Sequence, residues 1–366
     1  MLKKLLIRKF IFIFIVCILL SCIYNKNEKT GNSSQNANYY DNNIIIIDKP
    51  TNGLRHTKGE PLECSFHKYD NNTDIDSILI FINNCFIKKL NGNENKIILS
   101  TVEQKLGNLK ITFEAYSGSE KDKKEVRISL LSNINPLERK YKIINVFPHS
   151  TNSYTQGLIY KDGVLYESAG LYGKSAIRIV NIKTGESIKS SSLSNNYFAE
   201  GIALYNNKIY QITWKERTCF VYDQETLNSI NQYYYNIEEG WGLAFDGKNI
   251  LMSDGSNIIY IIEPNSFTVT DQFEVMDNKG LVNNLNELEY VDGKLYANVY
   301  QENYIVVIDC KTGSVIEKID FSGLLKDTDK SPSTDVLNGI AYNPEKKSFY
   351  ITGKNWPKLF EIVFLQ

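Results

Sequence analysis

TQGLIYKDGVLYESAG, residues 155–170, joins a short apolar strand pattern, a turn signal and a second strand pattern. Its opening recurs four times further along the chain, as AEGIALY (199–205), GWGLAFD (240–246), LNELEYV (285–291) and LNGIAYN (337–343). Each copy is followed by a turn and further short strand patterns. Units of roughly 40–50 residues that contain short strands and no helix predict a β-propeller, and five units predict five blades.

The fifth unit shows only three strand patterns, so its fourth strand must come from elsewhere. KYKIINVF (140–147) precedes the first motif and is the candidate. Pairing this strand with the last unit would close the ring and remove two free sheet edges. A sandwich or an irregular β protein is the alternative for this region, and the regular repeat favours the propeller over residues 140–366.

Residues 43–133 form a different unit. They contain about seven short β-type runs separated by Gly, Asn and Lys, which is typical of an immunoglobulin-like β-sandwich. No catalytic constellation occurs in this stretch, so we expect a spacer or docking module. The predicted fold is therefore all-β, with a five-bladed β-propeller preceded by a small immunoglobulin-like sandwich.

The N-terminus has the features of a targeting segment. Residues 1–22 combine a basic start, a short apolar run and the ending LLSC, which predicts a lipoprotein signal peptide with Cys22 as the lipidation site. An uncleaved anchor is the alternative. Residues 23–42 are polar and low in complexity, as in a flexible tether. We expect a lipid anchor in a bacterial cell envelope, on the periplasmic side or at the outer membrane.

The composition of the chain argues against several classes of partner and cofactor. The formal net charge of −1 gives no sign of a nucleic-acid partner. Three scattered histidines and no CxxC argue against a zinc site, and we expect no metal and no cofactor. Cys64 and Cys85 could form a disulfide in an exported protein, whereas Cys219 and Cys310 lie in apolar strand patterns that suit free buried thiols equally well. We expect a monomer.

Equivalent positions of the five motifs would meet at one end of the propeller channel. The position before the motif glycine is held by Gln156, Glu200, Trp241, Asn286 and Asn338. Four of these are polar, and a buried polar side chain costs free energy unless it is hydrogen-bonded. A water-filled channel with structural amides is one interpretation.

The other interpretation is a ligand pocket, because aromatic side chains and a lysine should surround these five positions. Trp214, Tyr300 and Lys354 come from second strands, and Tyr154 and Phe198 lie two residues before Gln156 and Glu200. An apolar wall disfavours the charged form of a carboxyl, so Glu200 could donate and take back a proton near neutral pH. We expect Trp356 to be core. Asp254 and Glu287 should lie near the ring, without an assigned role.

Several stretches, including SYTQGLIY, EGIALYNNKIYQITW, EGWGLAFDG, LNELEYVDGKLYANVY and ITGKNWPKLFEI, resemble the glutamine cyclotransferase family of plant and bacterial type. The resemblance covers residues 141–366. It implies a five-bladed propeller that converts the N-terminal glutamine of a peptide to pyroglutamate with release of ammonia, without a metal, and peptides or proteins with N-terminal Gln as partners.

The resemblance also implies residue roles. Glu200 matches the catalytic acid, and Gln156 and Asn286 match positions that hold the substrate's amine and carboxamide. The aromatic walls and the pocket lysine are matched by Tyr154, Phe198, Trp214, Trp241 and Lys354. Tyr300 stands where the family commonly has Trp, which could change substrate preference or rate.

Two other functions remain open at this point. A non-catalytic propeller could bind a peptide or an envelope partner in the same pocket. A metal-dependent lactonase-like hydrolase would need several carboxylates and amides around a cation, and one Glu, two Asn and one Gln support it weakly.

Overall fold

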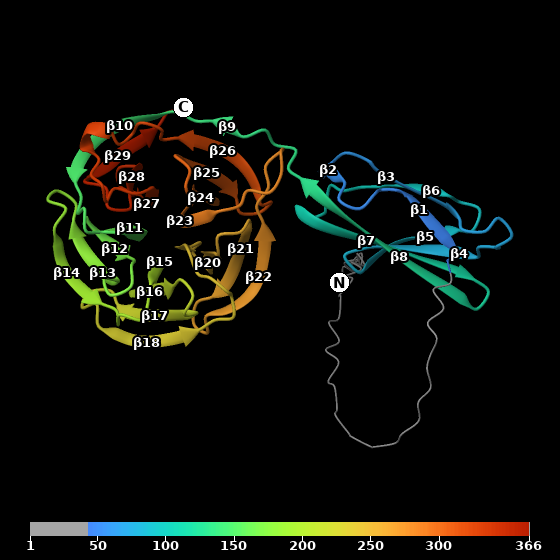
Figure 1. The fold of residues 1–366 in the computed structure, drawn as a ribbon, viewed down its shortest axis with the longest axis horizontal. Helices are drawn as coiled ribbons and strands as arrows, with labels where there is room; N and C mark the ends of the chain where they lie inside the picture. The colour runs from blue at the N-terminus through green and yellow to red at the C-terminus, as the bar shows by residue number, and fades with distance from the viewer. Residues whose placement is uncertain (1–42, 366) are drawn as a thin grey trace, which may run out of the picture. The chain divides into compact units, whose positions relative to one another are not determined.

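The computed structural model describes residues 43–365. The predicted signal peptide, the lipidation site at Cys22 and the tether therefore lie outside the described residues. Within 43–365 the chain is almost entirely β structure, with a single short 3-10 turn, η1 (Asp327–Asp329) (Figure 1). No helix in this part of the chain is both long and apolar enough to span a bilayer.

The N-terminal part contains eight strands in two sheets, where the sequence predicted about seven strands. The smaller sheet has the order β1 (Ile45–Lys49), β3 (Leu62–Lys68) and β6 (Lys96–Leu99). The larger sheet has the order β2 (Arg55–Thr57), β8 (Glu120–Leu131), β7 (Gly107–Ser117), β4 (Ser77–Ile82) and β5 (Cys85–Asn91). Both sheets contribute to one apolar core that includes Phe66 and Phe113.

The C-terminal part contains five sheets. The first has β11 (Thr155–Lys161), β12 (Val164–Ala169), β13 (Ala176–Asn181) and β14 (Ser187–Ser192). The second has β15 (Ala199–Tyr205), β16 (Lys208–Thr213), β17 (Thr218–Asp223) and β18 (Ser229–Tyr234). The third has β19 (Leu243–Phe245), β20 (Ile250–Ser253), β21 (Ile258–Glu263) and β22 (Thr268–Glu274).

The last two sheets each recruit a strand from the segment before the first motif. The fourth has β23 (Leu285–Val291), β24 (Lys294–Val299), β25 (Tyr304–Asp309) and β26 (Ser314–Asp320), to which β9 (Leu137–Glu138) adds in parallel. The fifth has β27 (Leu337–Asn343), β28 (Ser348–Gly353), β29 (Lys358–Phe364) and β10 (Tyr141–Pro148). The predicted closing strand is confirmed, because Tyr141 pairs with Phe364 and Phe147 with Leu359.

Local sequence explains the tight connection between the first two strands of a sheet. Lys161 pairs with Val164 across the two-residue turn Asp162–Gly163, and both turn residues have positive φ, of 50° and 83°. Asp-Gly and Asn-rich pairs tolerate this conformation, and the resulting turn matches the twist of the flanking strands. The same arrangement recurs at 206–207 and at 292–293.

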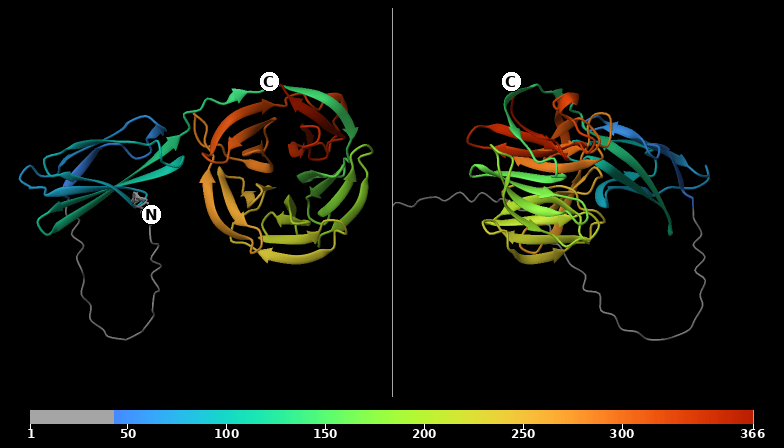
Figure 2. Two further views of the ribbon diagram at one scale, coloured as in Figure 1. Left: turned by 180° about the vertical axis from the view of Figure 1, so that it is seen from behind. Right: turned by 60° about the vertical axis from the view of Figure 1, so that its left-hand side comes forward.

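The five sheets form a ring. Their first strands contact one another in the cyclic order β11, β15, β19, β23, β27 and back to β11, and they lie nearest the centre in Figures 1 and 2. The motif glycines permit this approach: a Cβ at Gly201 would overlap the backbone of Gly242 and Leu243, and one at Gly242 would overlap the carbonyl of Asn286.

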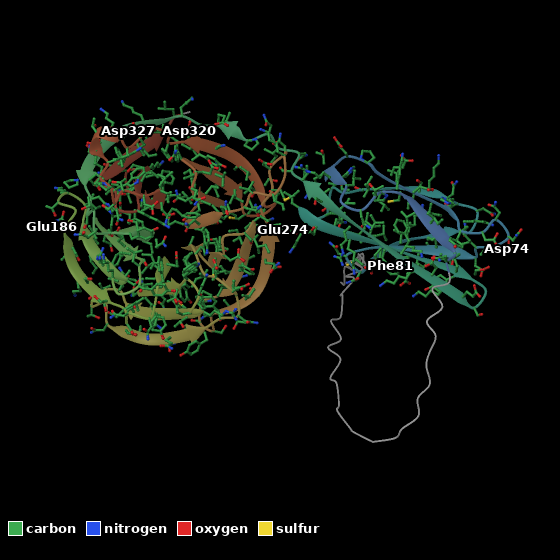
Figure 3. All side chains as sticks on the ribbon, viewed as in Figure 1. Asp74, Phe81, Glu186, Glu274, Asp320 and Asp327 are labelled. Atoms are coloured by element: carbon green, nitrogen blue, oxygen red, sulfur yellow. The ribbon has the colours of Figure 1, made fainter. Side chains whose placement is uncertain are left out.

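Apolar clusters between neighbouring sheets hold the ring together. Ile177 and Tyr222 belong to the cluster between the first and second sheets, and Leu165 and Tyr350 to the one between the first and fifth. Burial of each such side chain contributes about 1.5–3 kcal/mol. Charged side chains such as those of Glu186 and Asp327 lie on the outside of the ring (Figure 3).

The four cysteines of the described region are free thiols. Cys64 and Cys219 are buried, Cys310 is half-buried and Cys85 is exposed. The possible disulfide between Cys64 and Cys85 is therefore absent from this structure. Cys64 lies in the apolar core of the N-terminal part, where burial raises the pKa of its thiol to about 12.

Candidate active site

The nine side chains proposed from the sequence surround one cavity of about 240 Å³. Its lining residues are Tyr154, Gln156, Phe198, Glu200, Trp214, Trp241, Asn286, Tyr300 and Lys354. Pockets for whole small molecules usually measure about 300–1,000 Å³. The cavity therefore suits one end of a chain, such as a single terminal residue of a peptide.

Irregular pairing aims the motif side chains into the hub. The register between first and second strands shifts between Thr155 and Gly157, and again between Ala199 and Ile202. The same shift occurs around Asn286 and Asn338. Such β-bulges leave residues unpaired and redirect their side chains. The sequence motif placed these residues together, but it did not reveal the bulges.

Trp214, Tyr300 and Lys354 are each the first residue after a second strand, which ends at Thr213, Val299 and Gly353 respectively. The sequence placed them on these strands, so their position is corrected by one residue. They leave the sheet edge and line the cavity as loop residues.

A chain of hydrogen bonds orients the carboxyl group of Glu200. Asn338 Nδ2 donates to Gln156 Oε1 at 3.1 Å, and Gln156 Nε2 donates to Glu200 Oε1 at 2.9 Å. Asn338 Nδ2 also donates to the carbonyl of Thr155, at 2.9 Å. With its Oε1 acting as the acceptor, the carboxyl of Glu200 can carry a proton on Oε2.

Glu200 is suited to hold a proton near neutral pH. Its residue is 5% exposed, and burial raises the pKa of its carboxyl well above the ordinary value. The cation of Lys354 opposes this shift, while the negative charges of Glu239 and Glu216 add to it. Desolvation disfavours the carboxylate, so the protonated form predominates over a wider pH range than for an exposed glutamate.

Lys354 is the cation of the cavity. Its side chain is buried, and its Nζ lies 4.8 Å from the ring centroid of Tyr154 and 5.0 Å from that of Tyr300. Burial lowers the pKa of its ammonium, and the charges of Glu200 and Asp335 oppose that shift. Aromatic faces attract a desolvated cation and hold it in place.

The aromatic walls contact one another edge to face. Phe198 meets Trp214 at 5.7 Å and Tyr154 at 6.3 Å between centroids, and Trp241 meets Tyr300 at 5.5 Å. Rings arranged in this way stabilise one another beyond the area that they bury. Tyr300 thus keeps the wall position that the sequence comparison with the family assigned to Trp.

The sequence did not point to Glu239, which contacts two walls of the cavity. Glu239 Oε2 accepts a hydrogen bond from Trp214 Nε1 at 2.8 Å and another from Trp241 Nε1 at 3.0 Å. The only signal in the sequence is an acidic residue two positions before Trp241. Because both indole N–H groups are engaged, neither is free to donate into the cavity.

Asn286 presents an acceptor that has no partner. Among the described residues nothing bonds its Oδ1, although the residue is 2% exposed and lines the cavity. A buried carbonyl oxygen left in this way costs free energy. Because Asn286 also lines the cavity, its side chain is placed to meet an amide group of a ligand.

The remaining candidates lie outside the cavity. Trp356 is buried in the core between the fourth and fifth sheets, as expected. Asp254 accepts hydrogen bonds from Ser256 and Tyr260. Glu287 accepts the backbone N–H groups of Leu158 and Ile340. Within residues 43–365, no group of three or more His, Cys, Asp or Glu side chains is placed to hold a metal ion.

An all-β ring whose aromatic cavity is lined by one buried acid and by amides defines a class of protein suited to proton transfer on a small polar group. The comparisons narrow this class. The sequence profile of the glutamine cyclotransferase family matches residues 114–364, so the chain belongs to this family.

Two relatives are similar to a large part of the chain. The glutaminyl-peptide cyclotransferase of Arabidopsis thaliana is 39% identical over 244 residues, which is 65% of this chain and 74% of that protein. The crystal structure of Myxococcus xanthus glutaminyl cyclase superposes with a TM-score of 0.58 at 32% identity, and it covers 63% of this chain and 98% of that one.

Proposed function

We propose that the protein is a glutaminyl-peptide cyclotransferase, which converts the N-terminal glutamine of a peptide or protein to pyroglutamate. Membership of the family and the named relatives support this activity. The observation that carries it in the structure is that one aromatic cavity is lined by both a buried acid, Glu200, and the amide residue Asn286. These groups meet the two needs of the reaction, proton transfer and recognition of an amide.

The reaction is an intramolecular aminolysis. The substrate's α-amine nitrogen attacks the carbon of its own side-chain carboxamide, a C–N bond forms, and the bond to the amide nitrogen breaks. That nitrogen leaves as ammonia once it has gained a proton. Both reacting groups belong to one residue, so the enzyme supplies mainly the folded-back geometry. The cavity walls and Asn286 hold that geometry.

Glu200 moves the proton. The α-amine has an ordinary pKa of about 7.7–8.0, so its neutral form is readily available. The carboxyl of Glu200 donates its proton to the leaving nitrogen, and the carboxylate that results recovers one from the attacking amine. Gln156 keeps this carboxyl pointed at the cavity through the 2.9 Å hydrogen bond to Oε1. A buried acid with a raised pKa is suited to this exchange.

Lys354 stabilises the negative charge that develops on the carboxamide oxygen of the substrate. The sequence allowed either a tryptophan N–H or the lysine to polarise this oxygen, but both indoles donate to Glu239. Lys354 lines the same cavity and carries three N–H donors. A cation in a water-poor site stabilises an oxyanion strongly. The scheme assigns every step to side chains of this chain.

The decisive assay uses the purified protein and a peptide that begins with glutamine. We expect the loss of one ammonia from the peptide by mass spectrometry, together with ammonia in the solution by a coupled assay. A peptide that begins with asparagine is the control, because its shorter side chain would form a strained four-membered ring. Binding of the glutamine peptide without release of ammonia would favour the non-catalytic peptide-binding alternative.

We further propose the architecture and location that the sequence suggested. Five cyclic sheets, with β10 paired to β29, support a five-bladed β-propeller over residues 140–366. Two sheets around one core support an immunoglobulin-like sandwich over 43–133. The basic and apolar N-terminus ending in LLSC supports lipid anchoring at Cys22 in a bacterial envelope. Substrates would then be exported peptides or proteins.

A further inference from the structure

A single carboxylate oxygen connects two walls of the cavity. Glu239 precedes β19, and its Oε2 accepts both indole N–H groups, from Trp214 after β16 and from Trp241 before β19. Trp214 follows a strand of the second sheet, and Trp241 precedes a strand of the third. The two hydrogen bonds therefore connect loops of two neighbouring sheets.

Lys215 places a positive charge next to Glu239 and Trp214. Lys215 Nζ lies 3.5 Å from Glu239 Oε1 and 3.9 Å from the ring centroid of Trp214. Burial raises the pKa of Glu239, but the hydrogen bonds from the two indoles and the charge of Lys215 outweigh it, so the net shift is downward. Glu239 is thus an anion at neutral pH, and hydrogen bonds to an ionised acceptor are roughly twice as strong as neutral ones.

The two indoles transmit this restraint to the rest of the wall. Trp214 contacts Phe198 edge to face, and Trp241 contacts Tyr300 in the same way. All four rings line the cavity. Without the shared acceptor, each indole would retain its ring contact but would lose the atom that sets its rotation.

We propose that Glu239 is a positioning residue for the cyclisation: one oxygen fixes two indoles, and these shape the cavity around the substrate's glutamine side chain. The inference rests on the proposed function, because it concerns the same cavity. Glu239 does not line that cavity, so it acts through Trp214 and Trp241.

The charge of Glu239 has a second effect, on Glu200. Removing a negative charge near Glu200 lowers the pKa of its carboxyl, and the form that donates a proton is then lost at a lower pH. The charged groups that shift the pKa of Glu200 are Lys354, Glu239 and Glu216. Glu200 in turn raises the pKa of Tyr154, Tyr172 and Tyr235, which face it as neutral phenols. Of the three charged groups, only Glu239 also accepts hydrogen bonds from the indoles.

The test compares Glu239→Ala, Glu239→Gln and Glu238→Gln in the full-length protein. Glu239→Ala loses both indole bonds, and we expect KM for a glutamine peptide to rise about 10–100-fold, with a smaller fall in kcat. Glu239→Gln keeps one acceptor oxygen and should show a smaller rise. Glu238 is exposed and adjacent, so Glu238→Gln makes the same change of charge as a matched control and should behave as wild type.

Two further readouts separate positioning from a general structural role. The chain has three tryptophans, and two of them bond Glu239, so the tryptophan emission of Glu239→Ala should shift while its far-ultraviolet circular dichroism stays unchanged. The alkaline limb of kcat/KM for Glu239→Gln should move to lower pH. Glu238→Gln should change neither.

The outcomes distinguish this inference from the proposed function. If wild type releases ammonia and both Glu239 variants match it in KM, pH profile and emission, the positioning role is wrong. If wild type itself releases no ammonia, the proposed function is wrong. If Glu239→Ala does not fold, Glu239→Gln decides, because an unchanged KM and an unchanged alkaline limb in that variant would overturn the inference.

Discussion

The cavity around Glu200 and the interior of the ring around Glu287 each contain one fully buried glutamate on a first strand. Burial raises the pKa of both carboxyls well above the ordinary value, and for Glu287 the nearby charge of Glu289 adds to the shift. Their partners differ. Glu287 uses Oε1 for the N–H of Leu158 and Oε2 for that of Ile340, whereas Glu200 receives one amide N–H from Gln156.

The difference distinguishes the structural role of Glu287 from the chemical role that we propose for Glu200. Glu287 joins β23 to β11 and β27, so its two oxygens are committed to the backbones of two other sheets. Glu200 lines an open cavity and keeps one oxygen available to a ligand. Burial alone therefore does not mark a catalytic acid; what marks it is burial with an unused oxygen next to a space.

The largest expected effect comes from removing the proton of Glu200. Glu200→Gln is nearly isosteric, and we expect it to lower kcat by about 10²–10⁴-fold, the range of general acid–base contributions. The stability of the variant should stay close to that of wild type. Ammonia release from a glutamine peptide measures the rate, and urea unfolding measures the stability. A variant with wild-type kcat would remove Glu200 from the mechanism.

The opposite pattern is expected at Glu287. Glu287→Ala leaves two buried backbone N–H groups without an acceptor, and each costs about 1–3 kcal/mol. We therefore expect the free energy of unfolding to fall by about 2–5 kcal/mol, while kcat per folded molecule changes little. Glu287→Gln, which keeps one acceptor oxygen, should lie between. A loss of kcat without loss of stability would assign Glu287 to the chemistry and erase the contrast with Glu200.

A smaller effect, in the pH dependence of stability, should come from Glu289 on the same strand. Burial raises the pKa of its carboxyl to about 8, although the hydrogen bond from the Tyr342 N–H opposes this shift. A pKa raised above the unfolded value gives a contribution that is complete below about pH 4.5 and is lost as pH rises towards 8. Glu289→Gln should remove this loss.

The measurement is the free energy of unfolding of wild type and Glu289→Gln between pH 5 and 8. The difference between the two proteins should change by up to roughly 3 kcal/mol over this range, in favour of the variant at the higher pH, because one pKa unit corresponds to about 1.4 kcal/mol. Parallel curves would show that Glu289 titrates normally in the folded protein.

The repeat in the sequence was sufficient to predict the succession of strands and the closing pair. It also brought Gln156, Glu200 and Asn286 to one cavity, because equivalent positions of cyclic units must face the same centre. The strand that completes the fifth sheet could be found from the sequence since one unit was short by one strand and one strand pattern was left over.

Contacts between loops of different sheets could not be predicted from the sequence. Glu239 meets Trp214 only because two connections from different sheets approach each other at the cavity mouth, and no spacing encodes that approach. The bulges around Gln156 and Glu200 are register shifts of one residue, which alternating patterns do not resolve. Only the structure shows that both indole N–H groups bond Glu239, and this observation supports the oxyanion role that we propose for Lys354.

The pairing of β10 with β29 has a consequence for biosynthesis. β10 emerges from the ribosome before any of the five motif strands, but its antiparallel neighbour, β29, is translated after all of them. During synthesis β10 must therefore wait with an unpaired edge, which is where a nascent β protein is most exposed to wrong partners. A chain that stops short of β29 would leave this edge of β10 unpaired and open to wrong strand partners.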